Sequence, residues 1–66
     1  MSYYVVTADY RPKNPHKPEY TFRTDQGMAH VREWFADCYP WLKIYDVREV
    51  PENELSEGQR QWALTI

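Results

Sequence analysis

The sequence is poor in the residues that usually hold a very small domain together. Its 66 residues contain one cysteine and two histidines, so an internal disulfide is impossible, and no Cys/His cluster has the short spacing of a zinc site. A chain of this length buries only about 60% of the surface that its unfolded form exposes. We therefore expect a single domain, residues 1–66, whose stability comes from side-chain packing or from self-association.

Basic residues in excess and long apolar runs are also missing. Eight Lys and Arg stand against ten Asp and Glu, a net charge of −2, whereas domains that bind nucleic acid through phosphate contacts usually carry a basic stripe. No apolar run approaches a membrane span, and the N-terminus has no signal-peptide pattern. Together with the unpaired cysteine, these features predict a cytoplasmic protein that does not enter a membrane.

Aromatic residues, by contrast, are abundant, at 17% of the chain. Aromatic side chains bury large areas in small cores and are also enriched in binding surfaces. We expect most of them to pack inside the domain and the rest to face a partner.

The stretch 24–38 has the pattern of the one substantial helix. Its apolar stripe, at spacings of three and four, consists of Met28, Val31, Phe35 and Cys38. Thr24 and Asp25 stand where an N-cap is expected. The helix should end at Tyr39–Pro40, because the residue before a proline avoids the helical region.

Strand-like segments surround this helix, at residues 3–10, 19–23 and 41–50, with a fourth candidate in the tail after residue 60. Three prolines make residues 11–18 a stiff loop. The third segment changes its alternation near Tyr45–Asp46, which predicts a bulge. The acidic stretch 51–60 is expected to be a loop or a single helical turn.

The order strand, strand, helix, strand, with a possible last strand, predicts a two-layer α+β domain. We expect an antiparallel sheet of three to four strands with one helix packed across it. The sheet residues predicted to lie under the helix stripe are Tyr4, Val6, Tyr20, Phe22, Leu42 and Ile44.

No residue pattern indicates catalysis. His16, His30 and Cys38 lie too far apart in the chain to share one metal ion. The aspartates stand near element ends, where capping or solvation explains them, and the two glycines are isolated rather than part of a phosphate-binding loop. We therefore expect neither an enzyme nor a cofactor nor a metal site.

Binding to another protein is the one function considered that needs no motif which this sequence lacks. Tyr, Trp and Arg dominate binding hot spots. The predicted contact residues lie on the outer face of the sheet and at the corner after the helix: Tyr3, Arg23, Tyr39, Trp41, Tyr45 and Arg48. Self-association through the sheet, giving a homodimer, is compatible with this prediction.

The alternative function is the binding of single-stranded nucleic acid. In that case Tyr3 and Tyr45 would stack on bases, and basic side chains of the proline loop, such as Arg11 and Lys17, would contact phosphates. The net negative charge and the acidic segment 52–57 count against this alternative.

The order of elements over Tyr20–Val50 resembles that of small phage-encoded inhibitors of host machinery, among them inhibitors of bacterial RNA polymerase and small anti-CRISPR proteins. The residues that carry the likeness are the helix from Thr24, its aromatic end at Trp34–Pro40, and the strand with Arg48. The resemblance implies a phage or mobile-element protein that binds and inhibits a host complex, with Arg48 and its strand neighbours in contact.

Overall fold

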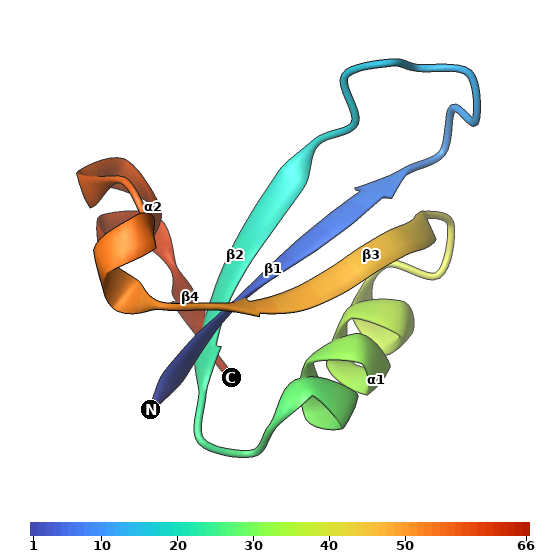
Figure 1. Cartoon of the computed structure of the whole chain (residues 1–66). Coiled ribbons are helices and arrows are strands. Elements are labelled where there is room, and N and C mark those ends of the chain that lie inside the picture. Colours follow the sequence, from blue (N-terminus) through green and yellow to red (C-terminus); the bar gives the residue numbers. More distant parts are fainter.

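A computed structural model describes all residues, Met1–Ile66. The elements are β1 (Ser2–Asp9), β2 (Glu19–Thr24), α1 (Met28–Cys38), β3 (Lys43–Val50), the 3₁₀ turn η1 (Glu52–Glu54), α2 (Glu57–Trp62) and β4 (Leu64–Thr65). The strands form one sheet in the order β3-β1-β2-β4 (Figure 1). The α+β class is confirmed. No helix has the length and apolar character needed to cross a membrane.

The three long strands form antiparallel pairs, as the sequence predicts. β1 is antiparallel to β2 and to β3, with Val6 opposite both Tyr20 and Val47. The register of β1 and β3 shifts between Thr7 and Ala8, which face Asp46 and Ile44, so that Tyr45 is the extra residue. The predicted bulge is thus confirmed.

The fourth strand differs from the prediction. β4 pairs with β2 in parallel, Phe22 opposite Leu64, so the sheet is mixed rather than antiparallel. The reason is the connection after β3: η1 and α2 carry the chain past the sheet and turn it back, and the tail enters beside β2 in the direction of β2. The acidic stretch 51–60 therefore holds more than a single turn. Ser56 and Gln59 form a capping box that starts α2.

The helix begins later than the sequence predicts. Thr24 is the last residue of β2, is buried, and accepts a hydrogen bond on Oγ1 from the Gln26 N–H at 3.1 Å, so it caps the turn and not the helix. The N-cap is Gly27, at φ 90° and ψ 175°, without a side-chain cap. This backbone conformation is nearly exclusive to glycine.

The core lies between α1 and one face of the sheet. Its buried members are Tyr4, Val6, Ala8, Phe22, Val31, Phe35 and Val47, and Tyr20, Leu42 and Ile44 pack against them. The predicted sheet face is therefore confirmed. The predicted helix stripe is only half right, because Val31 and Phe35 are buried whereas Met28 and Cys38 are exposed. The buried part of the helix thus extends only from Val31 to Phe35, in its middle.

The opposite face of the sheet is partly covered as well. Figure 1 shows the strands between α1 and α2. Val5, which points away from α1, is only 1% exposed, and Leu55 between η1 and α2 is 6% exposed. Both line a second hollow, of about 380 Å³, together with Val50. This second contact anchors the C-terminal segment to the sheet.

Candidate functional site

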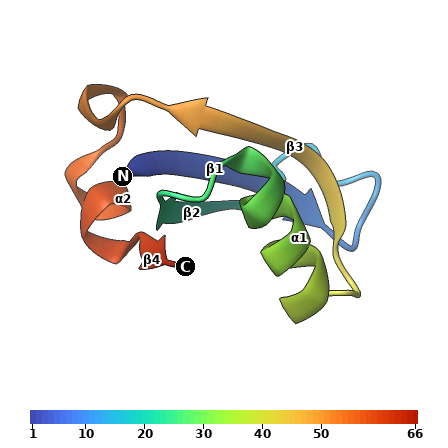
Figure 2. The same ribbon diagram turned by 90° about the horizontal axis from the view of Figure 1, so that it is seen from below.

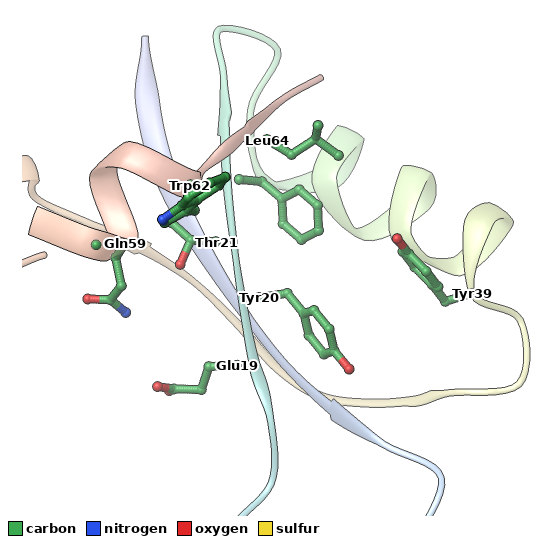
Figure 3. A pocket seen from close by; sticks show the side chains of 9 residues that line it. Glu19, Tyr20, Thr21, Tyr39, Gln59, Trp62 and Leu64 are labelled. Carbon is green, nitrogen blue, oxygen red and sulfur yellow. The ribbon is translucent and has the colours of Figure 1, made fainter. Parts of the chain in front are cut away.

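An open groove of about 430 Å³ runs along the outer edge of β2 (Figure 3). Its floor is Glu19–Phe22. Tyr39, after α1, and Leu64 of β4 lie on one side of β2, and Gln59 and Trp62 of α2 lie on the other. The groove is thus built by three segments that are far apart in the chain.

The floor of the groove is an unpaired strand edge. β4 pairs only with Phe22 and Arg23, and the Arg23 C=O accepts a hydrogen bond from the Ile66 N–H at 3.0 Å. Main-chain groups alternate in direction along a strand, so those of Glu19 and Thr21 point to the same edge as those of Arg23. No strand lies beside Glu19, because α2 leads the chain away before Leu64. This half of the edge can therefore accept another strand.

The walls of the groove are aromatic. The Tyr39 ring stacks on Tyr20, with ring centroids 6.4 Å apart, and packs against Phe35 at 5.0 Å. Trp62, on the opposite side, is 81% exposed, and Leu64, beside Phe22, is 48% exposed. Neither side chain belongs to the hydrophobic core. Large apolar groups that stand free beside an open edge are typical of a contact surface.

Two of the predicted contact residues, Tyr39 and Trp41, lie together at this site or next to it. Their rings meet edge to face at 5.7 Å. Tyr39 lines the groove, and Trp41 is 65% exposed outside it. The corner after α1 thus forms a contiguous aromatic surface with one wall of the groove.

Arg48 and Tyr45 lie elsewhere, on β3, and both already have partners within the chain. The Arg48 guanidinium binds Glu19 at 2.9 Å and Asp46 at 3.2 Å. These two hydrogen bonds, that to Glu19 first, raise the pKa of Arg48 above its usual value. The Tyr45 ring lies against Lys17 and Lys43, whose ammonium groups are 4.7 and 5.3 Å from its centroid.

Tyr3 and Arg23 form a third location. They lie opposite each other on β1 and β2, and the Arg23 side chain, which is exposed, reaches Met1 with Nε–Sδ 3.2 Å. The six predicted residues therefore do not form one patch. They divide between the groove corner, the face of β3, and the end of the sheet where β1 begins.

Trp62, Leu64 and the Glu19–Thr21 edge are not among the contact residues predicted from the sequence. In the sequence, Trp62, Leu64 and Ile66 occupy every second position, which indicates one face of a strand. In the structure Trp62 is the last residue of α2, and only Leu64 and Thr65 form β4. The sequence feature that points to this site is Trp62, a large apolar residue in a short C-terminal tail that cannot bury it.

The proline loop between β1 and β2 is organised by one buried carboxylate. Asp9, 2% exposed, accepts hydrogen bonds from the Asn14 side chain at 2.7 Å and the Arg11 N–H at 3.2 Å. Burial alone raises the pKa of Asp9, but the hydrogen bonds from Asn14 and Arg11 and the Arg11 charge outweigh it and lower that pKa. Asp9 therefore has a structural role in the loop.

No group of three or more His, Cys, Asp and Glu side chains is placed to hold a metal ion. Comparison of the chain with protein-family models, with curated proteins and with solved structures found no match. The groove at the edge of β2 is consequently interpreted from its own geometry.

Proposed function

We propose that this protein acts by contact, as a small binding module that takes an extended segment of a partner protein against the open half of β2. The observation that carries the proposal is the unpaired edge at Glu19–Thr21 lying on the floor of an aromatic groove. Main-chain hydrogen bonds would supply affinity, and the walls would receive alternate side chains of the segment.

The protein's own tail supports this mode of binding. β4 is an extended segment added to the same edge one residue further along, opposite Phe22 and Arg23. A partner segment would continue this row of strand pairing past Leu64. Its side chains would contact Tyr39 and Tyr20 on one side and Trp62 on the other, so apolar or aromatic residues at every second position fit the groove.

Capture from a bacterial lysate, with and without nuclease and with the bound proteins identified by mass spectrometry, tests the proposal. Thr21→Pro removes an N–H that points to the groove but leaves the pairing of β1 with β2, because proline is tolerated at a free strand edge. Trp62→Ala removes one wall. Both variants should lose a discrete, nuclease-resistant partner and keep the circular dichroism spectrum of the parent protein.

Trp41→Ala and Arg48→Ala serve as the comparison, because these residues belong to the contact surface predicted from sequence. Neither lines the groove, although Trp41 packs on Tyr39 and Arg48 binds Glu19. Loss of the partner in these variants alone would assign binding to that surface instead. A partner retained by Thr21→Pro and Trp62→Ala would contradict the groove.

We propose inhibition of a host complex, such as RNA polymerase or a CRISPR effector, as the setting of this contact, with the protein encoded by a phage or mobile element. Support comes from the small size, the exposed aromatic residues and the resemblance in element order. Recovery of subunits of such a complex in the capture experiment is the expected result, and recovery of unrelated proteins would contradict it.

Single-stranded nucleic acid, the alternative partner, receives less support from the geometry. The sheet face that would stack bases carries Val5, which is buried, and Arg48, which already binds two carboxylates. Nucleic-acid binding would fall steeply with salt, whereas binding of an apolar segment would not. Captured proteins that are lost after nuclease treatment would favour this alternative.

A further inference from the structure

The sheet has a second open edge, the outer side of β3, which is longer than the edge at the groove. β3 pairs with β1 only and is the outermost strand of the sheet. In Figures 1 and 2 no helix or strand lies on its outer side. An eight-residue strand, Lys43–Val50, is thus free along one side. Long free edges usually carry a feature that controls what can pair with them.

The direction of the main-chain groups along β3 follows from its neighbours. The Ala8 N–H donates to Pro18 on the side of β2, so by alternation the main-chain groups of Val5 and Thr7 point to β3. Their partners, Arg48 and Asp46, point back to β1. Val47, between them, therefore points its N–H and C=O outward to solvent.

The charged side chains on either side of Val47 are complementary to the same side chains of a second, antiparallel copy of β3. Asp46 precedes it and Arg48 follows it, both side chains lie on the sheet face away from α1, and they are 53% and 47% exposed. When a second β3 is laid antiparallel with Val47 opposite Val47, each Asp46 faces the Arg48 of the other copy. The bulge at Tyr45 interrupts the alternation of β3, so this register is defined by the residues from Asp46 to Val50.

We propose that this protein forms a homodimer by antiparallel pairing of two β3 strands about Val47, which joins two sheets into one of eight strands. The neighbouring registers are excluded by charge: centring the pair on Asp46, on Arg48 or on Glu49 places like charges directly opposite each other. The charges on this edge thus oppose other registers and favour this one. Each Asp46 exchanges the Arg48 of its own strand for that of the other copy.

This dimer is independent of the groove. The groove lies on β2, and two strands of the sheet order separate it from the outer side of β3. A dimer built in this way leaves both grooves open, one on each side of the enlarged sheet. The two proposals therefore succeed or fail separately.

Exchanging the charges tests the dimer. In Asp46→Lys both residues that flank Val47 are basic, and in Arg48→Glu both are acidic. Like charges then face each other across the strand pair, so each variant alone should dimerise less than the parent protein. Each should raise the dissociation constant of the dimer about tenfold or more in sedimentation experiments between about 10 μM and about 1 mM. An equimolar mixture of the two variants places opposite charges against each other at both positions and should restore a dimer.

Glu19→Gln is the matched control, since Glu19 also binds Arg48 but lies on β2. This variant should dimerise like the parent protein. Hydrogen exchange gives a second measurement: the Val47 amide should be protected in the parent dimer and exchange rapidly in either charge variant alone. A parent protein that stays monomeric at about 1 mM, or a dimer that both charge variants retain, would overturn the proposal.

Discussion

Arg48 of β3 reaches across β1 to Glu19 of β2, with the guanidinium nitrogen 2.9 Å from the carboxylate oxygen. β1 lies between them, since Arg48 is opposite Val5 and Glu19 is opposite Thr7. The pair thus connects the strand that carries the groove to the strand that carries the free edge. This ion pair also engages Arg48, which was predicted from the sequence to contact a partner.

This ion pair should contribute little to stability. Both side chains are almost half exposed, and exposed pairs are worth less than about 1 kcal/mol. A double-mutant cycle of Arg48→Ala and Glu19→Ala, measured by urea unfolding, should give a coupling in that range that decreases with added salt. A larger, salt-independent coupling would show that the pair is a main support of the sheet.

Phe35 should be the most costly side chain to truncate. It is fully buried and packs on Tyr20, Phe22 and Tyr39. Phe35→Ala should lower the free energy of unfolding by about 3–5 kcal/mol, a large share of the stability of so small a domain. The control is Met28→Ala, on the same helix but 41% exposed. Equal effects of the two variants on the urea midpoint would contradict the packing of α1.

Gly27 and Gly58 should respond to alanine with opposite signs. A Cβ at Gly27 meets nothing within 4 Å, but φ of +90° strains any other residue, so Gly27→Ala should cost about 1–3 kcal/mol. Gly58 lies inside α2 with room for a Cβ, 3.9 Å from Ser56 Oγ. Gly58→Ala should therefore stabilise by about 0.5–1 kcal/mol. Thermal unfolding of both variants decides this prediction, which a loss of stability in Gly58→Ala would contradict.

The Asp9 carboxylate should make stability depend on acid pH. Its pKa in the folded protein lies below the ordinary value of 3.8, so the ionised form stabilises the fold above that value. This contribution is lost as pH falls through the lower folded pKa. At about pH 7 the parent should exceed Asp9→Asn in stability, and at about pH 2 the difference should disappear.

Asp37→Asn is the control for Asp9→Asn, because Asp37 is exposed on α1. Its urea midpoint should follow that of the parent protein at both pH values. A difference between the parent and Asp9→Asn that is the same at both pH values would show that the loop does not depend on the carboxylate charge.

The comparison of sequence with structure separates two kinds of feature. Where a pattern repeats over several residues, as in β1 and β2, the sequence was sufficient, because strand periodicity and side-chain burial point to the same register. The break in this period near Tyr45 likewise located the bulge of β3. Where one residue sets the boundary of an element, as at the start of α1, the prediction was wrong. Thr24 resembles an N-cap in sequence, but the antiparallel ladder extends through it and leaves Gly27 to begin the helix.

The candidate site follows the same division. The aromatic character of Tyr39 and Trp41 and the presence of a contact surface were predictable, because residue type alone indicates them. Residue type and periodicity are therefore enough to specify the class of fold, the sheet face under the helix and the excess of aromatic side chains. The open edge beside Trp62 follows from the three-dimensional path of the chain instead. The parallel docking of a two-residue β4 depends on the path of α2 past the sheet, and no local pattern in the tail specifies such a long-range contact.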